Sequence, residues 1–295
     1  MVALALDVGG TKIAAGTVDA DGTVPHPVTT PTPATGVAEA CTALLREVAG
    51  DAKITSVGIA CAGPVDTVAG TVSPINIGEW AGGFGLVGAV QDLFPGVPAR
   101  LAMDGAAAAL GEHRHGAGRG APDLLSLVVS TGIGGGVILG GRIATGRTGN
   151  AGHIGHMVVP GGTDPCTCGG VGCLETVASG PSSVRWARSR GWRGTTGVEL
   201  ARAAADGDEV AVAALDRAGT ALGQAIASAA ALLDVDLAVI GGGFAQAGPP
   251  LWDPMRRAAA RHARLSFVAD LRVVPAELGA SGTLVGAAVL AAGEG

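Results

Sequence analysis

The same local pattern occurs twice in this chain, about half its length apart. It consists of an apolar strand, a glycine-rich turn and a second strand. The first copy joins Val2–Val8 to Ile13–Val18 through Gly9-Gly10-Thr11-Lys12, and the second joins Leu124–Ser130 to Val137–Leu139 through Thr131-Gly132-Ile133-Gly134-Gly135-Gly136. A repeat of this size indicates two related domains, and we expect each to present its glycine turn to a shared cleft.

Between the two copies and after them, strand patterns alternate with helical spacing, which predicts an α/β fold. A third glycine triplet, 241–243, follows a strand. The further expected strands are Thr23–Thr29, Ile54–Cys61, Ala99–Met103, Asp236–Ile240 and 271–274. The expected helices are 35–50, 86–94, Asp104–His115, 250–263 and a last one from 283, and helices also dominate 181–233, whereas 140–180 is rich in turns.

Glycine turns after strands suit the binding of a phosphate chain, because backbone N–H groups can approach the phosphates closely there. In the first turn Asp7 could hold Mg²⁺, while Thr11 and Lys12 supply a hydroxyl and a charge. Neither turn matches the P-loop or the dinucleotide-binding pattern. A single such turn is as often only a tight turn. Three of them favour nucleotide binding.

Three cysteines lie within eight residues, at Cys166, Cys168 and Cys173, and His156 precedes them. Three thiolates and one imidazole form a donor set suited to tetrahedral Zn²⁺, and the glycines between them allow tight wrapping. The alternative is a loop of unpaired thiols. His153 could be a fifth donor, but structural sites usually close at four.

Asp104 stands at the junction of the expected strand Ala99–Met103 and an alanine-rich helix. From position alone, the best interpretation is a helix N-cap, because Asp is a preferred residue there. A carboxylate at a strand end could also act as a base.

Composition excludes several classes of protein. A net charge of −6 without a block of Lys or Arg argues against nucleic-acid binding. The chain is 48% hydrophobic, but Ala and Gly supply much of that fraction, and no stretch of large apolar residues is long enough for a spanning helix. The first residues lack the features of a signal peptide. We therefore expect a cytoplasmic protein that binds no membrane.

Taken together, these motifs resemble the ROK family of sugar kinases, and its glucokinase-like members most. The resemblance covers essentially the whole chain. It rests on the segments DVGGTK at 7–12, GIACAGPVD at 58–66, Asn76 before Trp80, Met103-Asp104, STGIGGG at 130–136, AGHIGH at 151–156, CTCGGVGCLE at 166–175 and IGGGF at 240–244.

The resemblance implies a two-domain actin-like ATPase fold (ribonuclease H-like) with an interdomain cleft. The smaller domain would comprise 1–117 plus 283–295, and the larger one 118–282 with the zinc loop. The implied activity is transfer of a phosphoryl group from ATP with Mg²⁺ to the primary (6-) hydroxyl of a hexose or modified hexose. Relatives imply a homodimer or a tetramer.

The resemblance also assigns roles to residues. Asp104 would be the general base. Substrate contacts would come from Asn76, Met103, Asp104, His153, His156 and Glu175. The nucleotide would be bound by Asp7, Gly9, Gly10, Thr11, Lys12, Thr131, Gly132, Gly241, Gly242 and Gly243, and a structural zinc by His156, Cys166, Cys168 and Cys173.

This sequence departs from the family at two positions that ordinarily contact the sugar. Met103 replaces an Asn and His153 replaces a Glu. A buried hydroxyl that loses its partner costs about 1–3 kcal/mol. We therefore expect glucose not to be the best substrate, and expect an amino, deoxy or epimeric hexose instead.

Three other functions are compatible with parts of the pattern. A sugar-sensing repressor of the same family would carry a helix-turn-helix segment before the first strand, which here starts at Val2. A catalytically inactive sugar-binding protein is suggested by Met103 and His153, but Asp104 and the glycine loops argue against it. An actin-like or chaperone-like ATPase would lack the cysteine segment.

Overall fold

The computed structural model describes residues 1–293 of the chain. These residues form two compact units. The first contains 1–122, 136–152 and the chain from Ala280 on, and the second contains 123–135 and 153–279. The domain boundaries expected from the sequence remain a prediction. Each unit is described separately below.

The first unit is built on a five-stranded sheet of order β3-β2-β1-β4-β7. Its strands are β1 (Val2–Val8), β2 (Lys12–Val18), β3 (Val28–Pro31), β4 (Ile54–Cys61) and β7 (Ala99–Met103). β1 and β2 are antiparallel around the first glycine turn, whereas β1, β4 and β7 run parallel. Parallel strands end at one edge of the sheet, so the residues that follow β1, β4 and β7 gather there.

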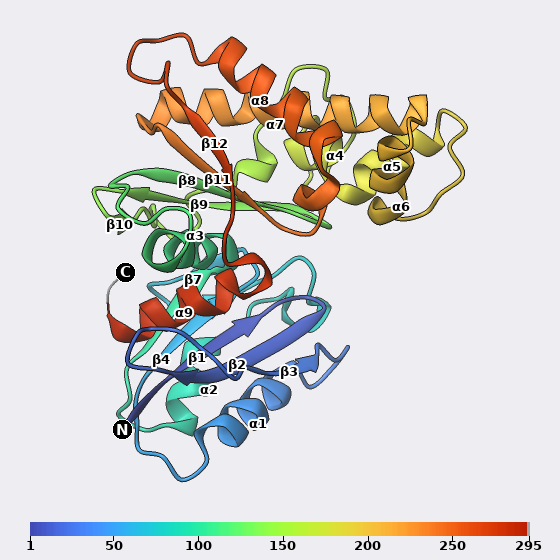
Figure 1. The fold of residues 1–295 in the computed structure, drawn as a ribbon. Coiled ribbons are helices and arrows are strands. Elements are labelled where there is room, and N and C mark those ends of the chain that lie inside the picture. The colour runs from blue at the N-terminus through green and yellow to red at the C-terminus, as the bar shows by residue number, and fades with distance from the viewer. Residues whose placement is uncertain (294–295) are drawn as a thin grey trace. The chain divides into compact units, whose positions relative to one another are not determined.

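Helices cover both faces of this sheet. Figure 1 shows α3 (Asp104–His115) and α9 (Gly282–Ala292) on one face, and α1 (Val37–Ala49) and α2 (Leu86–Leu93) on the other. A short hairpin of β5 (Val65–Asp66) and β6 (Thr71–Val72) and the 3₁₀ turn η1 (Gly78–Trp80) lie between β4 and α2 in the chain.

Small residues explain how α9 can pack so closely on α3 and β4. A Cβ on Gly286 would meet the backbone of Ala107, and one on Gly58 would meet the backbone of Ala287. The buried cluster beneath consists largely of alanines: Ala5, Ala14, Ala60, Ala107, Ala287 and Ala288, together with Leu284. The high Ala and Gly content is therefore the means by which backbones approach each other in this core.

The second sheet has the order β10-β9-β8-β11-β12. Its strands are β8 (Leu124–Val129), β9 (Ile133–Leu139), β10 (Arg142–Ile143), β11 (Leu237–Gly241) and β12 (Arg272–Pro275), and the division between the units passes through β9. In chain order, the two sheets have the same arrangement of strands. The duplication expected from the repeated strand–turn–strand pattern is confirmed.

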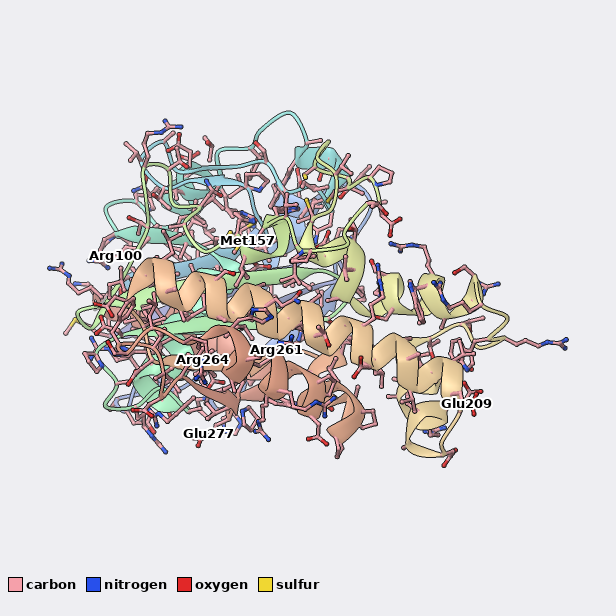
Figure 2. All side chains as sticks on the ribbon, turned by 90° about the horizontal axis from the view of Figure 1, so that it is seen from above. Arg100, Met157, Glu209, Arg261, Arg264 and Glu277 are labelled. Carbon is pink, nitrogen blue, oxygen red and sulfur yellow. The ribbon has the colours of Figure 1, made fainter. Side chains whose placement is uncertain are left out.

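The helices of the second unit are α4 (Leu174–Ala178), α5 (Gly180–Arg188), α6 (Gly197–Ala205), α7 (Glu209–Leu233) and α8 (Pro249–His262), with the 3₁₀ turns η2 (Ile154–His156) and η3 (Phe244–Ala247). A further 3₁₀ turn, η4 (Gly279–Ser281), precedes α9. Figure 2 shows the long helix α7 extending from Glu209 alongside α8, which carries Arg261. Gly219 and Gly223 of α7 allow this close packing, because a Cβ on either would meet the α8 backbone.

Most expected elements are confirmed within a few residues, but two are not. The expected strand Thr23–Thr29 is wrong in its start: the chain is irregular from Thr23 to Pro27, where Pro25 and Pro27 have no N–H to donate to a ladder, and β3 forms only from Val28. The strand after the second glycine turn starts at Ile133 instead of Val137, because three glycines of the motif pair as part of β9. None of the helices in residues 1–293 combines the length and apolarity that a bilayer crossing requires.

Candidate functional site

The first glycine loop connects β1 to β2 and is closed by the Gly9 N–H donating to Lys12 O at 3.0 Å. A residue from the end of β3 holds it from outside. The Thr32 hydroxyl donates to Gly9 O at 2.6 Å, and its N–H donates to Thr11 O at 3.0 Å. The Gly9 carbonyl and the Gly10 N–H belong to one planar peptide group, so the hydrogen bond to Gly9 O also fixes the direction of the Gly10 N–H. Thr32 was missed from the sequence, because nothing in a lone threonine indicates this contact.

The loop also lies against Asn76, the expected sugar-binding amide. A Cβ built on Gly10 would be 2.7 Å from the Asn76 side chain. Two predicted site residues, 66 positions apart in the sequence numbering, are thus in contact in the first unit. Only a glycine at position 10 lets them meet.

Asp7 and Asp104 lie at the carboxyl edge of the first sheet. Asp7 is near the end of β1, and Asp104 directly follows β7 as the first residue of α3. Burial raises the pKa of Asp7 to about 7, with the Asp104 charge adding to the rise and Lys12 opposing it. Burial also raises the pKa of Asp104, against a lowering by the Gly105 N–H. Two partly buried carboxyls whose charges influence each other are a common feature of catalytic sites.

The structure does not support the interpretation of Asp104 as a helix N-cap. Met103 occupies the cap position, and no side chain there accepts a hydrogen bond from the first turn. Asp104 Oδ1 accepts instead from the adjacent Gly105 N–H at 2.6 Å. Its carboxylate is therefore not committed to capping. Met103 is buried, with 1% of its surface exposed.

Cys61, at the end of β4, lies close enough to both carboxylates for their charges to act on it. Burial, followed by the charge of Asp104, raises the pKa of its thiol. Cys41 is buried in α1, where burial raises its pKa to about 12. Both thiols remain neutral, which confirms the expectation that they are small buried apolar groups.

The second and third glycine loops line one cavity of about 470 Å³ in the second unit. Ser130, Thr131 and Gly243 contribute to it, and Phe244 provides an aromatic wall. Gly242 has φ +95°, and a Cβ there would meet the Val129 backbone, so only glycine fits between β8 and the third loop. The cavity is mostly apolar with a few polar groups at its glycine-lined side, which suits a nucleoside with its phosphates on the loops.

The rest of that cavity is lined by residues that the sequence analysis did not assign to the site. They are Gly180, Pro181, Val184, Thr195, Thr196, Gly197, Val198, Ala201, Gln246 and Ala247. Thr196 and Glu199 form a capping box at the start of α6, with the Glu199 N–H donating to Thr196 Oγ1 at 3.1 Å. The T-x-x-E spacing predicts such a helix start, but it does not show that the start lies at a cavity.

The structure brings the four predicted zinc ligands together. His156, Cys166, Cys168 and Cys173 place their ligand atoms within 4.8 Å of one another. The Cys168 and Cys173 Sγ atoms are 3.7 Å apart, as are Cys166 Sγ and His156 Nδ1. Tetrahedral zinc with bonds of about 2.3 Å to sulfur and about 2.0 Å to nitrogen gives about 3.8 Å between two sulfurs and about 3.5 Å between sulfur and nitrogen, close to these two separations. The donor set therefore fits a structural zinc ion, and the chain wraps it through the Gly169 N–H donating to Cys166 O.

Next to this cluster lie the predicted sugar-binding residues of the second unit. Glu175 follows Cys173 by two residues in α4, and its Oε2 accepts from the Ile133 N–H at 2.9 Å. His153 Nε2 is buried and has no hydrogen-bond partner among the described residues. Burial, followed by the His156 ring, lowers the pKa of His153, although the Glu175 charge raises it. A carboxylate and an unpartnered neutral imidazole provide both the acceptors and the donors that a polyhydroxylated ligand needs.

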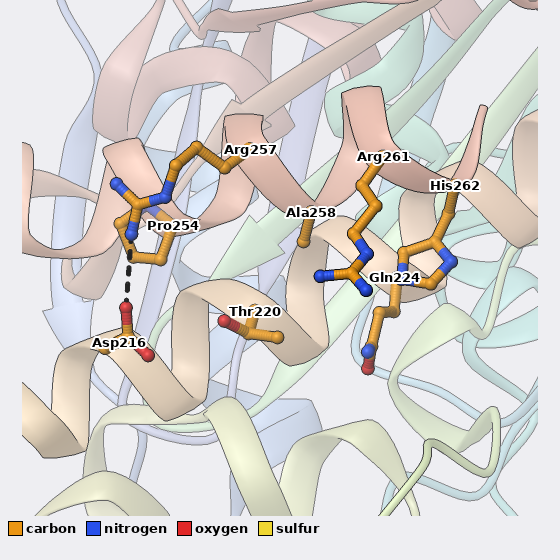
Figure 3. A pocket seen from close by; sticks show the side chains of 8 residues that line it. All are labelled: Asp216, Thr220, Gln224, Pro254, Arg257, Ala258, Arg261 and His262. Carbon is orange, nitrogen blue, oxygen red and sulfur yellow. Dashed lines mark hydrogen bonds and ion pairs between the residues drawn. The ribbon is translucent and has the colours of Figure 1, made fainter. Parts of the chain in front are cut away.

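A larger cavity, of about 640 Å³, lies between α7 and α8. Figure 3 shows its lining, where Arg257 pairs with Asp216 at 3.2 Å and Arg261 and His262 lie further along α8. None of the predicted site residues lies there, and it has no glycine loop. Its size alone does not make it the nucleotide site.

Comparison with known proteins agrees with this geometry. The model of the ROK family matches residues 3–294. A glucokinase from Streptomyces coelicolor is 33% identical, over 98% of this chain and 96% of its own. A kanosamine kinase from Amycolatopsis mediterranei is 34% identical, over 98% of this chain and 95% of its own.

Solved structures agree in fold. A ROK hexokinase from Thermus thermophilus has a TM-score of 0.88 and 36% identity, covering 100% of this chain and 99% of its own. A ROK family glucokinase from Streptomyces griseus, in complex with glucose and AMPPNP, has a TM-score of 0.84 and 34% identity, covering 99% and 100%. The expected two-domain actin-like fold with two mixed α/β sheets is confirmed. The chain belongs to the ROK family, with sugar kinases as its full-length relatives.

Proposed function

We propose that this sugar kinase transfers the γ-phosphoryl group of ATP to the primary (6-) hydroxyl of a hexose or modified hexose, with Asp104 as general base. The observation that carries the proposal is Asp104 itself, a partly buried carboxylate at the carboxyl edge of the first sheet with no capping role. The glucose and AMPPNP held by the Streptomyces griseus relative support a hexose and ATP as the two classes of substrate.

Asp104 accepts the proton of the attacking hydroxyl as the oxygen bonds to the γ-phosphorus and ADP leaves. A pKa raised above the ordinary aspartate value makes the carboxylate a better proton acceptor. Most of the rate enhancement in phosphoryl transfer comes from positioning and charge stabilisation. The Gly105 N–H bond, which fixes Oδ1, is part of that positioning.

The glycine loops hold the nucleotide in this proposal. Gly9, Gly10, Thr11 and Lys12 bind phosphates in the first unit; Thr131, Gly132, Gly241, Gly242 and Gly243 bind the nucleotide in the second. Asp7 holds Mg²⁺ directly or through water, and the ion neutralises phosphate charge when bound. A nearby cation would also lower the raised pKa of Asp7 and keep it ionised.

Zinc has a structural role in this proposal. Its ligands His156 and Cys173 are close in the chain to His153 and Glu175, so a bound zinc ion would hold these two side chains in place for the sugar hydroxyls. Asn76 contributes an amide from the first unit.

The sugar is a hexose other than plain glucose. Met103 is buried and offers a thioether in place of an amide, and His153 offers an imidazole in place of a carboxylate. An amino, deoxy or epimeric hexose fits these groups better, and kanosamine kinase is among the relatives. The expected cytoplasmic location and the expected homodimer or tetramer remain predictions.

The second candidate is a sugar-binding protein without activity. A coupled assay of ADP release separates the two, run with ATP and Mg²⁺ alone and then with each sugar of a panel of hexoses and amino sugars. Sugar-dependent ADP release is expected, with a modified hexose giving a higher kcat/KM than glucose. ADP release that no sugar stimulates would favour the binding protein, and a large preference for glucose would contradict the substrate proposal.

A further inference from the structure

Glu175 lies in the candidate sugar site and also contacts the chain next to the glycine loop that lines the nucleotide cavity. The two oxygens of its carboxylate are in different situations. Oε2 accepts from the Ile133 N–H at 2.9 Å, while Oε1 has no hydrogen-bond donor among the described residues. A carboxylate can accept several hydrogen bonds at once, so Oε1 is available to a ligand hydroxyl.

Ile133 is the first residue of β9 and directly follows the second glycine loop. Ser130 and Thr131, three and two residues earlier, line the 470 Å³ cavity that suits a nucleoside. The Ser130 carbonyl accepts from the Gly180 N–H at 2.9 Å, and the Ser130 N–H donates to Gly132 O at 2.9 Å. The loop is therefore bound at Ser130 and at Ile133 by the segment 175–180.

The zinc side of the second unit meets the same loop. A Cβ on Gly155, next to the zinc ligand His156, would collide with Ile133 O. Ile133 is thus held at its N–H by Glu175 and packed at its carbonyl by the turn that carries His156. The backbone of Ile133 therefore lies between Glu175 on its N–H side and the turn that carries His156 on its carbonyl side.

From these contacts we infer that Glu175 couples the two substrates, so that binding of the sugar raises the affinity for the nucleotide and the reverse. The inference rests on the proposed function for the identity of the two ligands. A sugar hydroxyl that donates to Oε1 fixes the rotamer of Glu175. That rotamer holds the Ile133 N–H and so orders the loop at the nucleotide cavity. The ligand that binds first orders the loop and loses the conformational entropy of doing so, and the second ligand then binds without that loss. Each ligand therefore raises the affinity for the other by the same factor.

Gly132 offers a way to break this link while the Glu175 carboxylate itself is kept. Because Gly132 is also assigned to the nucleotide, the measured quantity is the ratio of AMPPNP affinities with and without sugar. A Cβ there would lie 2.6 Å from Glu175 Oε2, so Gly132→Ala displaces the carboxylate. Gly134, two residues along, provides the matched control, because its Cβ would have no atom within 4 Å. Neither glycine has a positive φ, so the two substitutions differ mainly in this contact.

Glu175 itself gives a second pair of variants. Glu175→Gln keeps a carbonyl oxygen that can accept from the Ile133 N–H, whereas Glu175→Ala removes every acceptor. Glu175→Gln is expected to weaken sugar binding and retain part of the coupling. Glu175→Ala is expected to lose both.

The test is the Kd of AMPPNP with Mg²⁺, measured by calorimetry without sugar and with saturating sugar, the sugar being the member of the hexose panel with the highest kcat/KM. The wild-type chain is expected to bind AMPPNP about tenfold more tightly with sugar, within the usual range of coupling between sites. Gly132→Ala should bring this ratio to within about twofold of one. Gly134→Ala should keep it, whatever its effect on the separate affinities.

Zinc content and the unfolding midpoint show whether each variant is folded; if Gly132→Ala is not, the Glu175 pair decides the outcome. Three results would overturn the inference without affecting the proposed kinase activity. The first is equal AMPPNP affinity of the wild-type chain with and without sugar. The others are full coupling in Gly132→Ala and equal coupling in Glu175→Gln and Glu175→Ala. If no sugar is phosphorylated, the proposed function fails. The ratio can then still be measured with glucose as the probe, and a ratio of one would overturn the coupling as well.

Discussion

The nucleotide-loop region of the first unit and the zinc segment of the second obtain their order in different ways. In the first, Asp7 and Asp104 stand at the ends of paired strands, above a core of alanines and glycines. In the second, His153 directly precedes the 3₁₀ turn η2 and Glu175 lies in the five-residue helix α4, both next to a cysteine cluster in a segment with little regular structure. A sheet can fix the positions of partly buried carboxyl groups through its strands, whereas the positions of side chains in an irregular segment depend on a metal and on single hydrogen bonds. The two regions should therefore respond differently to substitution.

The largest effect is expected at Asp104. Asp104→Asn removes the proton acceptor, and kcat should fall by about 10²–10⁴-fold, the usual contribution of a general base. The KM for ATP should change little, and the unfolding midpoint should not drop. Asp92→Asn, an exposed change on α2, is the matched control and should retain full turnover. Near-normal turnover in Asp104→Asn would show that Asp104 is not the general base.

We expect the ionised Asp7 carboxyl to lower the free energy of unfolding, although the proposed Mg²⁺ binding requires this charge. Its pKa of about 7, against 3.8 when exposed, means that ionisation of this carboxyl opposes folding. The penalty is absent below pH 3.8, grows as the pH rises, and is complete above about pH 7. A shift of about three units corresponds to at most about 4 kcal/mol.

Asp7→Asn should therefore raise the free energy of unfolding at pH 8 by a few kcal/mol in urea titrations without Mg²⁺, and the gain should vanish near pH 4. Its activity should fall, because the Mg²⁺ ligand is lost. A variant that is less stable than wild type at pH 8 would contradict the assigned direction of the pKa shift.

Removal of zinc should affect the second region and spare the first. Cys173→Ser should lower bound zinc, measured by mass spectrometry, and raise the KM for the sugar roughly tenfold or more through displacement of Glu175. Cys41→Ala, a buried thiol outside the cluster, should keep the metal. If Cys173→Ser loses zinc and keeps its sugar KM, the metal does not order the sugar segment.

The smallest expected effect is at Thr32. Thr32→Val removes one hydrogen bond, to Gly9 O, which is worth about 1 kcal/mol. The KM for ATP should rise several-fold with the sugar KM unchanged, and Thr32→Ser should restore it. A change confined to the sugar KM would show that Thr32 does not act through the first loop.

The sequence predicted the regular parts of the molecule well. The repeated strand–turn–strand pattern indicated two similar sheets, and their strand orders agree. The ligand spacing in the cysteine segment predicted the zinc cluster, because such spacing leaves few other uses for three thiols.

Contacts between distant residues were not predictable. Nothing in the sequence shows that Thr32 reaches Gly9, that Glu175 reaches Ile133, or that Gly180 and Phe244 share a cavity. For Asp104, position favoured the N-cap interpretation, and only the geometry of α3 shows that Met103 holds that place. Such contacts depend on tertiary packing, which local patterns do not encode.

The most direct test of the account is to identify the product. The purified chain is incubated with ATP, Mg²⁺ and each hexose of the panel, and ³¹P–¹H correlation NMR assigns the carbon that carries the new phosphate. The account predicts a hexose 6-phosphate, formed fastest from a modified hexose, and no such product with Asp104→Asn. Phosphate on a ring or anomeric hydroxyl, or no sugar phosphate at all, would contradict it.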